Sequence, residues 1–387
     1  MSESDHQDWQ DGGFGLYVHW PFCASKCPYC DFNSHVVASI DQRAWLEAYR
    51  LEIARLAAET GPRVLRSIFF GGGTPSLMDP EVVAGVIEAA RAGWSFSNDL
   101  EITLEANPGS VERGRFSGYA EAGVNRLSMG VQALNDDDLR RLGRLHSVAE
   151  ARAAFDVARG CFGRVSFDLI YARQGQTREG WKAELRAALG MAVDHLSLYQ
   201  LTIEDGTAFG ARAAAGRLKG LPDDDLAADM YLDTQDLCSA HGFPAYEVSN
   251  HARPGAESRH NLVYWRQGDW VGIGPGAHGR LTLEGRRWAT EAPRAPGAWL
   301  EAVRRGSGEL TRVAVPVEEQ ATEYLLMSMR LAEGMDIARH ERLSGAPLPQ
   351  EAVADLIALG LVDLSQGRLR ATDAGRPVLN AILRTLA

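Results

Sequence analysis

The sequence contains 387 residues, of which 45% are apolar and 24% charged, and its formal net charge is −11. A chain of this length and composition can bury a large core, which excludes a mainly disordered protein and indicates a main domain with a smaller one. The acidic balance argues against general binding to nucleic acid, because such binding needs clustered Lys and Arg. No apolar run is long enough to span a membrane, and residues 1–11 lack the pattern of a signal peptide, so we expect a cytoplasmic protein.

Short β-branched or apolar runs alternate with amphipathic segments from residue 15 to about residue 203. This alternation predicts repeated βα units on a parallel sheet. Strands are predicted at residues 15–20, 64–71, 101–107, 126–132, 164–171 and 195–203, with helical patterns such as 42–59, 80–91 and 149–159 between them. A closed barrel of this type needs eight units, so these six predict an incomplete α/β barrel.

The pattern changes after residue 203. We expect a helix at 223–241, a strand at 245–249 and a glycine-rich stretch near 268–279. Helical patterns at 318–330 and 350–359 precede a hairpin pattern at 361–371 and a last helix, a combination that resembles a small winged-helix-like module. We therefore divide the chain into a tail (1–14), a partial barrel (15–242), an extension (243–312) and a mainly helical domain (313–387). The last part is not basic enough to predict DNA binding, so a lid or interaction domain is favoured.

Three of the five cysteines stand close together, in the loop after the first predicted strand. Cys23, Cys27 and Cys30 can supply three thiolates to three irons of a 4Fe–4S cluster, which leaves the fourth iron without a protein ligand. The alternative is structural zinc, with His19 or His35 as a fourth ligand. The spacing of three and then two residues is uncommon for zinc hairpins, so an iron–sulfur site is favoured.

Polar residues recur where the following predicted strands end. Because the carboxyl ends of parallel barrel strands meet at one face, we expect these residues to share a site. A carboxylate such as Glu105 suits an amino group, the Arg144 guanidinium suits a carboxylate, and glycine-rich backbone allows a ligand to approach closely. The set suits a zwitterionic nucleoside and comprises Gly72, Gly73, Thr74, Glu105, Gln132, Arg144 and Asp168. The alternative role for each residue is an ordinary polar network at the barrel rim.

Six short motifs follow one another along the chain: Tyr17-Val18-His19-Trp20-Pro21-Phe22-Cys23, Gly71-Gly72-Gly73-Thr74-Pro75, Glu105-Ala106-Asn107-Pro108, Gly130-Val131-Gln132, Gly143-Arg144-Leu145-His146 and Asp168-Leu169-Ile170-Tyr171. Through these motifs the chain resembles the radical S-adenosylmethionine (SAM) superfamily, and within it the branch of the oxidase HemN and the haem chaperone HemW. The resemblance implies a 4Fe–4S cluster on Cys23, Cys27 and Cys30. It also implies SAM contacts from Tyr17, Tyr29, Gly72, Gly73, Thr74, Glu105, Gln132, Arg144 and Asp168.

A further motif separates the two members of this branch. Residues 259–265 include His260, Asn261, Tyr264 and Trp265, and look like the His-Asn-x-x-Tyr-Trp motif typical of HemW. The resemblance implies that His260 ligates haem iron, whereas a lone His among aromatic residues is otherwise most often part of the core. The oxidase carries an additional Cys two residues after the last cluster Cys, and Phe32 stands there in this chain.

These features favour a haem chaperone over two alternatives. The chaperone that we expect binds haem, a 4Fe–4S cluster and SAM, and an electron donor reduces its cluster. It passes haem to acceptor proteins, and membrane-associated haem enzymes are candidate acceptors. The first alternative is an oxygen-independent coproporphyrinogen III oxidase, against which the missing Cys weighs. The second is a radical enzyme for an unrelated substrate. One departure from the family pattern, Ala172-Arg173-Gln174 in place of Gly-Leu-Pro, puts the shape of that loop in question.

Overall fold

The computed structural model describes residues 7–109 and 113–387. The first six residues of the predicted tail lie outside the described residues. Part of its remainder forms the short helix α1 (Trp9–Gly12). Arg339 ties this segment to the C-terminal part of the chain, because its Nε and Nη2 donate to the two carboxylate oxygens of Asp8 at 2.8 and 2.7 Å.

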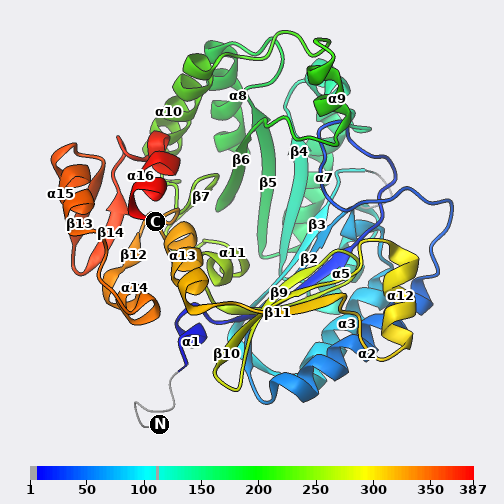
Figure 1. The fold of residues 1–387 in the computed structure, drawn as a ribbon. Coiled ribbons are helices and arrows are strands. Elements are labelled where there is room, and N and C mark those ends of the chain that lie inside the picture. Colours follow the sequence, from blue (N-terminus) through cyan, green and yellow to red (C-terminus); the bar gives the residue numbers. More distant parts are fainter. Residues whose placement is uncertain (1–6, 110–112) are drawn as a thin grey trace.

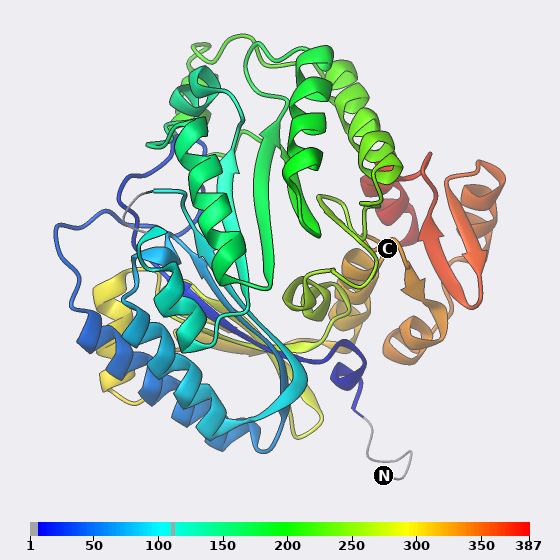
Figure 2. The same cartoon turned by 180° about the vertical axis from the view of Figure 1, so that it is seen from behind.

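The predicted βα units form a curved sheet with helices on its outer face, as Figure 2 shows from behind. Its parallel strands are β1 (Phe14–Trp20), β2 (Val64–Gly72), β3 (Ser95–Ala106), β4 (Arg126–Gln132), β5 (Arg164–Tyr171) and β6 (His195–Gln200). The helices between and after them are α2 (Gln42–Thr60), η2 (Pro75–Leu77), α3 (Pro80–Gly93), α5 (Phe116–Ala122), α6 (Asp136–Arg141), α7 (Val148–Cys161), α8 (Arg178–Met191), α9 (Ala208–Ala214) and α10 (Asp224–Ala240). The incomplete α/β barrel is confirmed.

The sheet extends at both edges beyond the six predicted strands. The added elements are β7 (Asn250–Ala252), α11 (Arg259–Trp265), β8 (Asp269–Ile273), β9 (His278–Leu283), β10 (Arg286–Glu291), α12 (Pro296–Arg304) and β11 (Thr311–Ala314). Within the described ranges, eleven strands follow the order β11-β10-β9-β8-β1-β2-β3-β4-β5-β6-β7. β8 runs parallel to β1, and β7 pairs antiparallel with β6. β1 is therefore an interior strand, and both of its faces are almost fully buried.

Two predictions for the segment from β6 to β7 are wrong. The strand expected at 245–249 is instead a bend that leads into β7, because the buried Glu247 carboxylate accepts the backbone N–H of Ser249 and the side-chain amide of Asn250. β6 ends at Gln200 and not at residue 203, and the residues after it line a cavity.

The C-terminal part folds around an apolar core of its own, built from residues such as Leu325, Met335, Leu369 and Ile382. Its elements are α13 (Val317–Ser328), β12 (Met335–Asp336), α14 (Ile337–Ser344), α15 (Gln350–Ala358), β13 (Val362–Ser365), β14 (Arg368–Ala371), η3 (Arg376–Val378) and α16 (Leu379–Leu386). The predicted hairpin is present as β13 and β14. Figure 1 shows this module, in orange and red, beside α10 and β7. In the described part of the chain, no helix is both long and apolar enough to cross a bilayer.

Candidate functional site

The three cysteines stand on the loop that leaves β1 at the carboxyl edge of the sheet. Backbone hydrogen bonds fold this loop back on itself, from Cys23 N to His35 O at 3.0 Å and from Cys30 N to Cys27 O at 3.1 Å. All three thiols are half-buried, and burial raises the pKa of Cys23 and Cys30. Binding of a metal cluster would therefore have to displace protons from these thiols.

The glycine-rich turn after β2 approaches the cysteine loop so closely that side chains are excluded. Gly72 has a φ of 110°, and a Cβ on it would lie 2.6 Å from the His19 ring. A Cβ on Gly73 would lie 2.6 Å from the carbonyl oxygen of Phe22. Thr74 then donates its hydroxyl to the Cys23 sulfur at 3.3 Å. The absence of side chains at Gly72 and Gly73 therefore allows Thr74 to contact the cysteine loop.

Two carboxylates face the same space from β3 and β5, the parallel strands on either side of β4. Glu105 ends β3 and accepts the backbone N–H of Gly72 at 3.3 Å, while Asp168 on β5 accepts the Ser128 hydroxyl at 3.4 Å. Burial, together with the negative charge of Asp168, raises the pKa of Glu105 to about 8. Burial raises the pKa of Asp168 to about 6. At neutral pH the ligand-free protein therefore holds Glu105 largely in its protonated form.

Arg144 reaches the cysteine loop from the segment that follows α6. Its Nη1 donates to the Cys27 sulfur at 3.3 Å and its Nη2 to the carbonyl oxygen of Gly130 at 2.8 Å. Nη2 also donates to Asn107, whose amide in turn donates to the Thr74 hydroxyl at 3.1 Å. Among the described residues the buried Nε of Arg144 has no hydrogen-bond partner, so one donor is free for a ligand. The prediction missed Asn107, although it belongs to the same strand-end motif as Glu105.

These side chains enclose one small cavity of about 130 Å³, which we call the cluster cavity. Eleven of the thirteen predicted cluster, SAM and haem residues line it: Cys23, Cys27, Tyr29, Cys30, Gly72, Gly73, Thr74, Glu105, Gln132, Arg144 and Asp168. The soft thiolates suit an iron–sulfur cluster. The guanidinium with its free donor and the two carboxyl groups suit a zwitterionic ligand beside that cluster. In residues 7–109 and 113–387, no three His, Cys, Asp or Glu side chains converge on one point as a single metal ion would require. In a cubane each thiolate instead binds a different iron.

The other two predicted residues, Tyr17 and His260, lie outside the residues that line the cavity. Tyr17 hydrogen-bonds His19 Nδ1 through its hydroxyl at 3.0 Å, and its ring stacks on Phe69 and on His260. The His260 ring lies against Phe69, with 4.9 Å between the ring centroids. Both residues therefore belong to the aromatic layer packed along β1 and β2.

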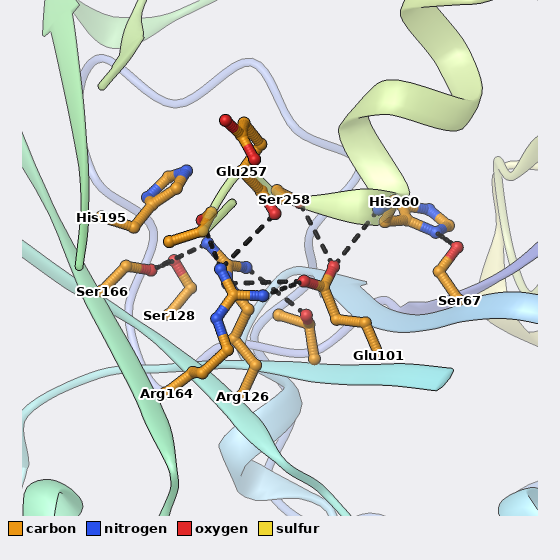
Figure 3. Close-up of polar contacts among 12 residues, drawn as sticks. Ser67, Glu101, Arg126, Ser128, Arg164, Ser166, His195, Glu257, Ser258 and His260 are labelled. Carbon is orange, nitrogen blue, oxygen red and sulfur yellow. Dashed lines mark hydrogen bonds and ion pairs between the residues drawn. The ribbon is translucent and has the colours of Figure 1, made fainter. Parts of the chain in front are cut away.

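His260 is the second residue of α11 and is only 1% exposed. Its Nδ1 pairs with the Ser67 hydroxyl at 2.8 Å and its Nε2 with the Tyr264 hydroxyl at 2.6 Å. Its backbone N–H donates to Glu101, which also pairs with Arg164 at 2.7 Å (Figure 3). Burial, aided by the charge of Arg126, lowers the pKa of His260 to about 3. The ring is therefore neutral, and neither nitrogen is free to ligate iron in this conformation.

The loop that departs from the family pattern is held by Arg173, which is 3% exposed. Its Nη2 contacts Asp138 at 3.0 Å and Glu184 at 2.5 Å, and its Nη1 donates to the carbonyl oxygen of Ile170 at 2.5 Å. A weaker contact of 3.4 Å reaches the carbonyl oxygen of Gln132. The shape of this loop thus depends on a buried ion pair, where the usual family residue would be apolar.

An incomplete α/β barrel that gathers three cysteines, a glycine-rich turn and paired carboxyl groups at its carboxyl edge has the architecture of a radical SAM protein. The model of the radical SAM superfamily matches residues 17–188, and that of the HemN C-terminal domain matches residues 315–378. The chain is 40% identical to the mouse protein "Radical S-adenosyl methionine domain-containing protein 1, mitochondrial", over 96% of this chain and 86% of that one. It therefore belongs to the radical SAM superfamily and to its HemN/HemW branch. Membership of this superfamily implies a 4Fe–4S cluster and SAM as cofactors.

Two bacterial relatives match from end to end. The chain is 38% identical to "Heme chaperone HemW" of Haemophilus influenzae, over 95% of this chain and 96% of that one. It is 37% identical to the protein of the same name from Escherichia coli, with the same coverage of both chains. Among solved structures, the coproporphyrinogen III oxidase HemN of Escherichia coli superposes with a TM-score of 0.80, covering 98% of this chain and 92% of that one. At 23% identity, this last likeness concerns the fold alone.

Proposed function

We propose that this protein is a haem chaperone, which binds haem and transfers it to acceptor proteins. The observation that carries the proposal is the similarity, at 37–38% identity over 95% of the chain, to proteins named for that activity. Phe32 adds support: it stands where the HemN-type oxidase has an additional Cys, and 59% of its surface is exposed beside the cluster cavity. An apolar ring there suits contact with a flat apolar ligand.

Within this function, Cys23, Cys27 and Cys30 would hold the 4Fe–4S cluster, and the residues predicted above to contact SAM would hold that ligand. The cluster, when bound, supplies one electron at a time to the bound nucleoside. Arg144 would offer its free Nε to the carboxylate of SAM, and Glu105 would accept a hydrogen bond from the amino group once its carboxyl has lost its proton. The backbone of Gly72 and Gly73 leaves room for the ligand between the two loops.

One anaerobic experiment tests the proposal. The reconstituted protein is titrated with haem while the Soret band is followed, and the same sample is assayed with SAM, a reductant and coproporphyrinogen III. We expect haem to bind with a dissociation constant in the micromolar range or below and no coproporphyrinogen to be decarboxylated. Turnover to protoporphyrinogen would make the protein an oxidase despite Phe32. Absence of any binding to either tetrapyrrole would point to an unrelated substrate.

Transfer requires a second assay, because binding alone does not distinguish a carrier from a store. Haem-loaded protein is mixed with the apo form of a candidate acceptor, such as a membrane-associated haem enzyme, and the acceptor is then separated and its haem measured. We expect faster loading than from the same concentration of free haem. Equal rates with and without the protein would contradict the chaperone function.

A further inference from the structure

A second, larger cavity lies between the mouth of the barrel and the C-terminal module. Its volume is about 830 Å³, within the range of small-molecule sites. Six residues line both this large cavity and the cluster cavity, so the two spaces adjoin: Tyr29, Cys30, Phe32, Glu105, Gln132 and Asp168. A ligand in the large cavity would therefore lie beside the cluster and the SAM residues.

Charge is distributed unequally along the large cavity. The barrel side supplies acidic groups, such as Asp31 and Asp168, and the loop and helix after β6 add Glu204 and Asp224. The only basic side chains in the described lining are Arg330 and Arg376, and both come from the C-terminal module. The barrel and the segments after β6 thus supply the acidic side chains of this lining, and the C-terminal module supplies the basic ones.

Neither arginine is neutralised by an ion pair with a described carboxylate. Arg330 follows α13 and donates to the carbonyl oxygen of Leu326, and Arg376 begins η3 and lies against the hydroxyl of Tyr231. Burial lowers the pKa of Arg330, an effect that the negative charge of Glu247 opposes. A half-buried guanidinium without an anionic partner is costly unless a ligand supplies the anion.

Much of the remaining lining of the large cavity is apolar and aromatic. It includes Ile170, Leu201 and Val248, together with the rings of Tyr199 and Tyr231. Tyr199 is 43% exposed although it stands on β6, inside the barrel, because its ring faces the cavity. Flat apolar ligands pack against such surfaces.

We propose that the large cavity seats a tetrapyrrole whose two propionates pair with Arg330 and Arg376, and whose opposite edge points toward the cluster. This inference rests on the proposed function and specifies where and in which orientation the haem lies. A tetrapyrrole matches the cavity in size, its macrocycle matches the apolar wall, and its two carboxylates match the two unpaired guanidinium groups. The site is distinct from His260, which does not line the cavity.

The test compares two probes that differ only at the propionates, namely ferric protoporphyrin IX and its dimethyl ester. Both are titrated anaerobically into the reconstituted protein, the double variant Arg330→Gln/Arg376→Gln and a control, Arg305→Gln, which alters the exposed C-cap residue of α12. We expect the unaltered protein and the control to prefer the free acid by roughly tenfold or more. The double variant should lose this preference while binding the ester as the unaltered protein does.

Further variants keep the outcome interpretable. Arg330→Lys/Arg376→Lys should retain part of the preference, because the positive charges remain, and Arg376→Gln alone serves if the double variant does not fold. An unchanged preference in a folded, cluster-containing double variant would overturn the inference while leaving the chaperone function standing. Two equivalents of SAM bound per chain, reduced to one by the double variant, would also overturn it by identifying the ligand as a second nucleoside. Failure of the unaltered protein to bind haem at all would instead refute the proposed function.

Discussion

Glu105 provides a sharp test of the electrostatics of the site through the variant Glu105→Gln. Burial and Asp168 raise its pKa from 4.5 to about 8, so the folded protein keeps a proton on this carboxyl that the unfolded chain releases above pH 4.5. Because the folded state then binds more protons than the unfolded state, stability from this group falls as pH rises toward 8. Gln has a similar shape and no such proton, so the variant should lose that dependence.

The size of the effect follows from linkage. Each pH unit between the two pKa values changes the free energy of unfolding by about 1.4 kcal/mol. Between pH 6.5 and 8.5, titration of Glu105 through a pKa of about 8 should remove about 2 kcal/mol from the unaltered protein, and the variant should lack this contribution. For a chain of 387 residues that unfolds as one unit, this difference corresponds to roughly 2–3 °C in the midpoint of thermal unfolding. Asp168, with a pKa of about 6, titrates mostly below this window.

The assay is a thermal unfolding scan of the ligand-free protein at half-unit steps between about pH 6.5 and 8.5. Glu301→Gln, at an exposed position of α12, controls for the loss of one negative charge. We expect the curve of Glu105→Gln to be flatter than those of the unaltered protein and of the control. Parallel curves for all three proteins would refute the argument, because Glu105 would then be ionised in the folded state.

Three further predictions concern the cluster, the loop after β5 and the His-Asn-x-x-Tyr-Trp motif. Replacing the three cluster cysteines together by Ala should remove iron and sulfide while circular dichroism remains that of a folded protein; a full complement of iron would reject the assignment. Arg173→Leu should destabilise the protein by about 1–3 kcal/mol, measured by denaturant unfolding, because it leaves the half-buried carboxylate of Glu184 without its cation, whereas Asp138 keeps its contact with Arg141. His260→Ala should destabilise it by about 2–4 kcal/mol in the same measurement, because the ring is buried and both nitrogens are paired; no loss would contradict its placement.

The parallel strands could be predicted from sequence because their signal is local. β4 and β5 have the predicted bounds, since both are short apolar runs enclosed by helical patterns. β3 begins six residues earlier than predicted, at Ser95 and not at residue 101. Its first half is polar and half-exposed, so it lacks the apolar run that marks an interior strand, and pairing with β2 defines it instead.

The antiparallel edge could not be predicted in the same way. β8 carries Asp269, which is fully buried between Arg63 at 2.7 Å and Arg287 at 2.9 Å. A charged residue in a short segment indicates a loop, and only the fold brings together a cation from position 63 and another from position 287. The local sequence pattern around Asp269 therefore cannot predict the ion pairs that stabilise this strand.

The site shows the same division between local and long-range information. The strand-end rule predicted that the three cysteines and seven polar or glycine residues would meet, and all ten line one cavity, together with Tyr29, which the family resemblance implied. The rule did not reveal Arg330 and Arg376, which reach the large cavity from a module more than a hundred residues beyond β6. Nor could it reveal that the Arg144 guanidinium contacts a cysteine sulfur.

His260 shows why affinity alone will not identify the haem ligand. Polar contacts lead from its backbone N–H to Glu101, and from Glu101 through an ion pair of 4.0 Å to Arg126. Arg126 reaches Asp168 through the hydroxyl groups of two serines, each step at 3.1–3.4 Å. A substitution at His260 would thus disturb the cavity that holds Asp168 even if haem never touches the imidazole. Weaker haem binding by His260→Ala is therefore expected whether His260 is a structural residue or a haem ligand. The axial-ligand signature in the haem spectrum separates the two roles. If His260 ligates the iron, His260→Ala should change this signature and Tyr264→Phe should leave it intact.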